Sequence, residues 1–151
     1  MNILITNISV LPVKKNKDKG DLIKYKVNIS DYDGAEIEAI HTNESILKCV
    51  SHIKSVKETG GINKIVALVS NKVKNDFIEA YQSTALDYYC SKVQECFGDI
   101  EIVKISIETD SVYSVPVKEA IILKQICEQI SKKDVVYIDS AGGARTTSSL
   151  I

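Results

Sequence analysis

The sequence has almost no net charge, no long apolar run and no metal-binding pairing of cysteine with histidine. Nineteen basic residues face twenty acidic ones, which excludes the strongly basic surface that holds long nucleic acid. The longest uncharged apolar run is far below the ~20 residues of a membrane span, and the N-terminus lacks the pattern of a signal peptide. We therefore expect a cytoplasmic protein whose segment here makes no membrane contact.

The four cysteines lie in apolar-periodic stretches and form no CxxC motif. His41 and His52 stand eleven residues apart, with no partner residues at metal-ligand spacing. The sequence therefore predicts reduced core thiols rather than a zinc site. We expect no metal and no cofactor.

A length of 151 residues fits one domain, 1–151. Alternating or apolar runs predict strands, and apolar residues at helical spacing predict helices between them. The predicted strands cover 2–11, 64–70, 100–107 and 134–139; the predicted helices run from 42 or 43 to Gly60, from about Asp76 to Gly98, and from Pro116. An added β-hairpin is predicted near residues 22–40. The fold class is α/β, a Rossmann-like, mainly parallel sheet flanked by helices.

Ligands of such sheets bind beyond the carboxyl ends of the strands. In this sequence that rule selects four segments: Thr6–Ser9, Ser70–Lys72, Glu108–Ser114 and Ser140–Thr147. The last is the most informative, because Gly142 and Gly143 follow a buried strand and a hydroxyl-rich segment begins a predicted helix. Glycine amides and a helix N-terminus together favour an anion.

Arg145 is the single arginine among the nineteen basic residues. Its planar guanidinium suits bidentate contacts to phosphate. The alternative is that the two glycines simply close a strand-to-helix turn. SAGGART also resembles the loop of protein tyrosine phosphatases, but Asp139 stands where their cysteine nucleophile would be, and a carboxylate does not replace that thiolate. We therefore reject phosphatase chemistry.

A second resemblance covers roughly the whole chain. The stretch from Asp139 to Arg145 resembles the motif D-[ST]-[TS]-G-G-x-R of CARF domains, the CRISPR-associated Rossmann-fold sensors, with Ala141 in place of a hydroxyl residue. The opening strand, the strand that ends at Ser70 and the helix that starts at TNES are similar to that family as well. The resemblance implies binding of a cyclic oligoadenylate, the second messenger of type III CRISPR systems in antiviral defence.

The resemblance also implies a homodimer that holds one ring across its two-fold axis and controls an effector module in the same longer protein. We expect the chain to stop before the last helix and strand of such a domain. The residues expected to bind the ligand come from three of the four segments: Asn7, Ser9, Ser70, Asn71, Lys72, Ser140, Ala141, Gly142, Gly143, Ala144, Arg145, Thr146 and Thr147.

Other interpretations stay open at this point. Asn7 and Ser9 can cap the end of the first strand, Lys72 can belong to a solvated face, and TNES can be a helix N-cap. Asp139 is expected to anchor the turn by accepting amide hydrogen bonds. The chain is expected to be a sensor without catalysis, the alternatives being a ring nuclease that cleaves the messenger and a generic nucleotide-binding α/β module.

Overall fold

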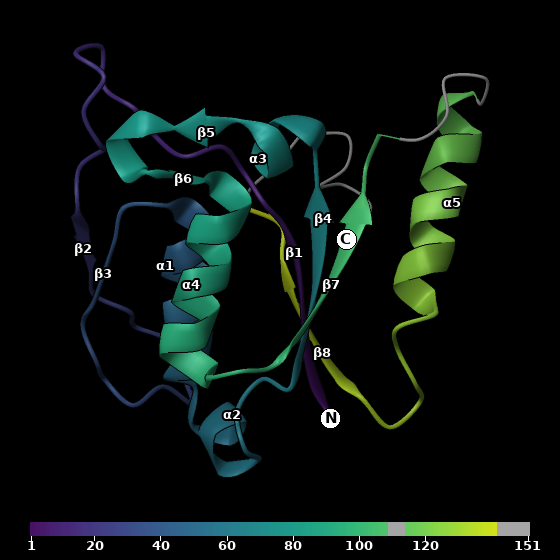
Figure 1. The fold of residues 1–151 in the computed structure, drawn as a ribbon. Coiled ribbons are helices and arrows are strands. Elements are labelled where there is room, and N and C mark those ends of the chain that lie inside the picture. Colours follow the sequence, from purple (N-terminus) through teal and green to yellow (C-terminus); the bar gives the residue numbers. More distant parts are fainter. Residues whose placement is uncertain (109–113, 142–151) are drawn as a thin grey trace.

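A four-stranded parallel sheet forms the centre of the molecule, as the computed structural model of residues 1–108 and 114–141 shows. Its strands are β1 (Asn2–Asn7), β4 (Lys64–Val69), β7 (Glu101–Ser106) and β8 (Val135–Asp139), in the order β7-β4-β1-β8 (Figure 1). Parallel neighbours need long crossover connections, and the helices supply them. The predicted Rossmann-like α/β fold is confirmed.

Helices cover both faces of this main sheet. The helices α1 (Thr42–Ser51) and α4 (Ala85–Phe97) lie against one face, and α5 (Val115–Cys127) lies against the other (Figure 1). Alternate residues of β1 point to opposite faces, so Leu4 packs with the first pair and Ile5 packs with α5. Each fully buried side chain of this kind stabilises the fold by about 1.5–3 kcal/mol.

The predicted hairpin is present but stands apart from the main sheet. The strands β2 (Ile23–Tyr25) and β3 (Ile37–Ala39) pair antiparallel as a separate two-stranded sheet. The strand β2 is short, and Ile29 beyond it is 53% exposed. Of the two strands only β3 buries apolar side chains, Ile37 and Ala39.

The predicted helix from Asp76 to Gly98 is wrong in its first half. That stretch and the residues before it contain α3 (Asn71–Asn75), β5 (Phe77–Ile78), the 3₁₀ helix η1 (Glu79–Tyr81) and β6 (Ser83–Thr84). Gln82 adopts a left-handed φ of 51°, which stops the turn before it, and the Thr84 hydroxyl then caps α4 by accepting from the Asp87 amide at 3.1 Å. Gly98 ends α4 as predicted.

The first predicted helix is also divided, because α2 (Lys54–Glu58) is separate from α1. The Lys54 amide donates to the Asp31 carbonyl at 2.7 Å, a contact with the hairpin loop that an uninterrupted helix would not make. Pro116 lies in the first turn of α5 as predicted. In the described part of the chain, no helix has the length and apolar character needed to cross a membrane.

The prediction that all four cysteines are core thiols is wrong for one of them. Cys127 is exposed at the end of α5, whereas Cys49, Cys90 and Cys96 are half-buried, and all four are free thiols. The helix α5 is apolar on more than one side, so its spacing does not identify the face that packs on the sheet.

Candidate functional site

The four parallel strands of the main sheet end at one side of the molecule, which we call the carboxyl edge. There β1 runs into Ile8 and Ser9, β4 into Ser70, and β8 into Ser140 and Ala141. Thr6 and Asp139 are direct partners in the register of β1 and β8, so the ends of these strands lie side by side. Six of the predicted ligand residues lie outside the described part of the chain: Gly142, Gly143, Ala144, Arg145, Thr146 and Thr147.

A cavity of about 180 Å³ opens at the carboxyl edge. We call it the edge cavity; its lining residues are Asn7, Ile8, Ser9, Val10, Ser70, Val73 and Ile107. Three predicted ligand residues from two strand ends, Asn7, Ser9 and Ser70, therefore meet in one hollow. Asn71 and Lys72 follow on α3 and are not part of its lining.

Asp139 anchors the turn after β8, as predicted. Its Oδ1 accepts from the Ala141 amide at 2.9 Å, and its Oδ2 accepts from the Thr6 hydroxyl at 3.0 Å and from the Asn43 amide group at 2.9 Å. The residue is only 2% exposed. A buried carboxylate with this many donors fixes the direction in which the chain leaves β8 toward the glycine pair.

Asn43 joins the ends of β1 and β8 to helix α1. Its Nδ2 donates to Thr6 Oγ1 at 3.1 Å, to the Asn7 carbonyl at 3.1 Å and to Asp139 Oδ2 at 2.9 Å. Its Oδ1 accepts from the amide and hydroxyl of Ser9 at 2.9 and 3.0 Å. The side chain is fully buried. Its place in the sequence predicts only a helix cap, because its partners lie 34 to 96 positions away along the chain.

His41, rather than Thr42 or Asn43, is the N-cap of α1. Its Nε2 lies 2.9 Å from both the carbonyl oxygen and the hydroxyl of Ser9. Burial lowers the pKa of His41, against the opposing influence of the Ser9 hydrogen bond and the charges of Glu44 and Asp139. The neutral ring must carry its proton on Nε2, because a carbonyl oxygen can only accept.

This tautomer determines whether His41 can activate the Ser9 hydroxyl. A protonated Nε2 donates a hydrogen bond and cannot accept the hydroxyl proton, so Ser9 and His41 do not form an activated nucleophile. The Ser9 hydroxyl in turn donates to Asn43 Oδ1. Ser9 lines the edge cavity, but its hydroxyl is hydrogen-bonded to His41 and Asn43.

Glu44 accepts a hydrogen bond from the His41 backbone amide at 3.3 Å through Oε1. Its Oε1 accepts from the Ile40 amide and from the Tyr88 hydroxyl at 2.8 Å, while Oε2 pairs with Lys48 at 2.7 Å. Burial opposes ionisation, yet the hydrogen bonds from Lys48, Tyr88 and Ile40 keep the pKa of Glu44 below its ordinary value. The buried carboxylate is thus a charged anchor between α1 and α4.

The segment after β4 is held mainly by its own contacts. The Ser70 hydroxyl accepts from the Val73 amide at 3.2 Å and caps α3, and the Asn71 amide donates to the Glu108 carboxylate at 2.9 Å. The Ser70 hydroxyl proton is still available as a donor. Lys72 lines a neighbouring hollow instead of the edge cavity.

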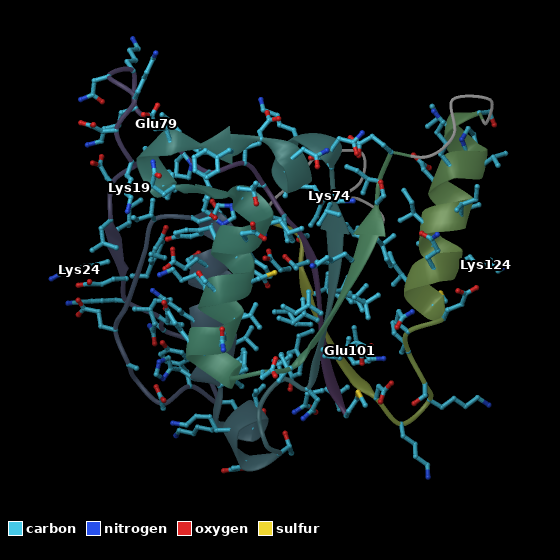
Figure 2. The ribbon with its side chains drawn as sticks, viewed as in Figure 1. Lys19, Lys24, Lys74, Glu79, Glu101 and Lys124 are labelled. Atoms are coloured by element: carbon cyan, nitrogen blue, oxygen red, sulfur yellow. The ribbon has the colours of Figure 1, made fainter. Side chains whose placement is uncertain are left out.

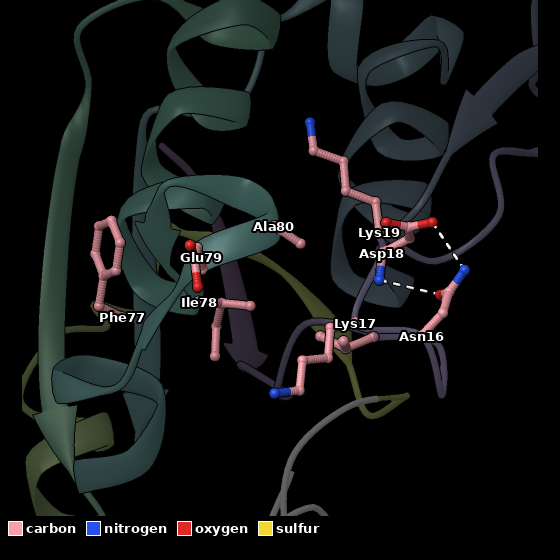
Figure 3. A pocket seen from close by; sticks show the side chains of 9 residues that line it. Asn16, Lys17, Asp18, Lys19, Phe77, Ile78, Glu79 and Ala80 are labelled. Carbon is pink, nitrogen blue, oxygen red and sulfur yellow. Dashed lines mark hydrogen bonds between the residues drawn. The ribbon is translucent and has the colours of Figure 1, made fainter.

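Two further cavities lie in the same part of the fold, and they share Val13 and Ile78 with each other. One of about 180 Å³, the side cavity, shares Val10 with the edge cavity; its lining residues are Val10, Leu11, Val13, Lys72, Asp76, Ile78 and Ala85. The other, of about 810 Å³, lies between the loop of residues 13–19 and the β5–η1 segment. Figure 3 shows Lys17, Lys19 and the mutually bonded Asn16 and Asp18 on one side of it and Glu79 on the other.

The polar side chains that line the edge cavity carry hydroxyl and amide groups. Within residues 1–108 and 114–141, no cluster of three or more His, Cys, Asp or Glu side chains could hold a metal ion.

Comparison with known proteins identifies a similar fold. No protein-family model and no curated protein matches the sequence. Csm6 from Enterococcus italicus, solved bound to cyclic hexa-2′-fluoro-hexa-dAMP, matches 99% of this chain with a TM-score of 0.52 and 10% identity. The chain spans 29% of that protein. At this identity the likeness shows that the two share a fold.

Proposed function

We propose that this chain is a CARF-like domain that binds a cyclic oligoadenylate at the carboxyl edge of its main sheet. The observation that carries the proposal is the anchored turn after β8. Asp139, held by Thr6, Asn43 and Ala141, fixes the end of β8 next to β1, whose Asn7 lines the edge cavity. Support comes from the likeness in fold to Csm6, which was solved with a cyclic hexanucleotide analogue.

The proposed contacts follow from the chemistry of each residue. Gly142, Gly143 and Ala144 would offer backbone amides to phosphate oxygens, and Arg145 would pair with phosphate through its planar guanidinium. Hydroxyl donors would come from Ser140, Thr146 and Thr147. From β1 the contact would be made by Asn7 and the backbone of Ser9, and from β4 by the Ser70 hydroxyl, Asn71 and Lys72.

We further propose that two copies hold one ring across a two-fold axis. A ring of repeated adenylates is itself symmetric, and an isologous dimer presents each glycine turn twice about its axis. Binding would then control an effector module of a longer, cytoplasmic protein that acts in antiviral defence. The contact between Ser9 and His41 has a donating imidazole, so these two described residues do not form an activated nucleophile.

The test is binding of cyclic tri-, tetra- and hexa-adenylate, measured by thermal shift and calorimetry. A ring at 100 times its dissociation constant stabilises the fold by about 2.7 kcal/mol, and the proposed stoichiometry is one ring per two chains. Arg145→Ala should weaken binding about 10- to 100-fold. Lys24→Ala, which changes an exposed residue of β2 (Figure 2), is the matched control and should bind normally.

Three outcomes would change the proposal. If no ring binds, the chain is a different nucleotide-binding or interaction module. If the nucleotide is cleaved during incubation, as chromatography would show, the domain is a ring nuclease. If Arg145→Ala binds as tightly as the unmodified protein, Arg145 holds the loop instead of the ligand.

A further inference from the structure

The side cavity combines apolar walls with two charged groups at one side. Val10 and Val13 of the segment after β1 and Ile78 of β5 belong to its lining. Leu11 and Ala85 are almost fully buried and belong to the hydrophobic core. A flat apolar group that entered this hollow would therefore replace water on several sides.

Lys72 and Asp76 supply the charges. Both side chains are exposed, and neither forms an ion pair or a side-chain hydrogen bond with another residue of the described chain. They lie on α3 and at its C-terminal end, so a short helix fixes their relative position. The hollow thus offers one unpaired cation and one unpaired hydrogen-bond acceptor.

The side cavity lies next to the edge cavity, where the ligand is proposed to bind. Val10 lines both the side cavity and the edge cavity, so the two hollows adjoin at that residue. A nucleotide whose phosphate and ribose occupy the carboxyl edge can direct its base over Val10 into the side cavity.

We propose that the side cavity is an adenine subsite, an inference that rests on the proposed function. The ring packs against Val10 and Ile78 of the lining, the Asp76 carboxylate accepts from the exocyclic 6-amino group, and Lys72 pairs with the adjacent phosphate. Adenine presents an amino donor at position 6, which purine riboside lacks. Asp76 is thus the residue that recognises the 6-amino group.

A chemical double-mutant cycle tests this assignment. The unmodified protein and Asp76→Ala are each titrated with the cyclic oligoadenylate that binds best and with the same ring built from purine riboside, which lacks the 6-amino group. Asp76→Ala should weaken binding of the adenylate ring about 10- to 100-fold, the range for a hydrogen bond to a charged group. It should leave binding of the purine ring unchanged, because the amino group is absent.

Two lysine variants test whether the charge of Lys72 contributes to binding of both rings. Lys72→Ala should weaken binding of both rings equally and reduce the salt dependence of binding. Lys74→Ala, on the same helix but outside the cavity lining (Figure 2), should change neither.

The outcomes distinguish the subsite from the function. If the unmodified protein binds the adenylate ring and Asp76→Ala binds it equally well, the subsite is refuted and the proposed function stands. If Asp76→Ala weakens both rings equally, Asp76 shapes the loop and does not contact the base. If no ring binds the unmodified protein, both proposals are wrong.

Discussion

Asn43→Asp is the most informative single change at the carboxyl edge. The substitution replaces the Nδ2 donor by a carboxylate oxygen of the same size, 2.9 Å from Asp139 Oδ2. It leaves an acceptor at the position that receives the Ser9 amide and hydroxyl. The change therefore removes the donor that faces Thr6, the Asn7 carbonyl and Asp139, and it places a second negative charge next to Asp139.

The expected cost follows from the charge of the new pair. Two unit charges 2.9 Å apart repel by about 6 kcal/mol at an effective dielectric constant of ~20, so the folded variant takes up one proton instead. Relative to an unfolded aspartate with a pKa of about 3.9, holding that proton costs about 5 kcal/mol at pH 7.5 and about 2 kcal/mol at pH 5.5. The folded state binds more protons than the unfolded state, so the variant loses stability as the pH rises.

Urea unfolding at the two pH values measures the effect. The quantity to compare is the difference in unfolding free energy between variant and unmodified protein, which cancels titrations common to both. Asn75→Asp, the same substitution at an exposed position, should show a difference near zero at both pH values. A loss for Asn43→Asp that is equal at pH 5.5 and pH 7.5 would show that Asn43 and Asp139 are not in contact.

Two further predictions concern His41 and the cysteines. Burial lowers the pKa of His41, so its contribution to stability is present above pH 6.5 and is lost below it by up to about 1.4 kcal/mol per pH unit. His41→Gln should therefore flatten the dependence of the unfolding free energy on pH below 6.5. Parallel curves for variant and unmodified protein would contradict the assignment. Thiol labelling should modify exposed Cys127 first, since burial raises the pKa of Cys49, Cys90 and Cys96. A fast phase that survives in Cys127→Ser would show that another thiol is exposed.

Several elements could be predicted from the sequence because their signals are local. The apolar run at Lys64–Ser70 predicts a buried central strand, and β4 occupies it. Gly98 ends α4 because glycine adopts a positive φ, and Pro116 lies in the first turn of α5 because its missing amide hydrogen is not needed there. Both effects act on the backbone at the residue itself. Asp139 as the anchor of its turn is local in the same way, because its amide partner is two residues ahead.

The breaks in regular structure were harder to predict. Apolar residues between Asp76 and Gly98 keep helical spacing, yet Phe77 is 61% exposed and the helix begins only at Ala85. Tertiary contacts outweigh a weak local preference here: the Tyr81 hydroxyl donates to the Pro12 carbonyl at 2.6 Å and accepts from the Gly20 amide. These partners lie more than sixty positions away along the chain.

The sequence alone determined the layered α/β class and the places of the four main strands along the chain. Tertiary structure decided the order of these strands in the sheet and which polar groups meet at its carboxyl edge. Thr6 and Asp139 are separated by 133 positions and Asn43 and Asp139 by 96, so no pattern of neighbouring residues records their contact. Periodicity reports which face of an element is apolar, whereas a buried hydrogen bond between strand ends exists only once the sheet has fixed their register.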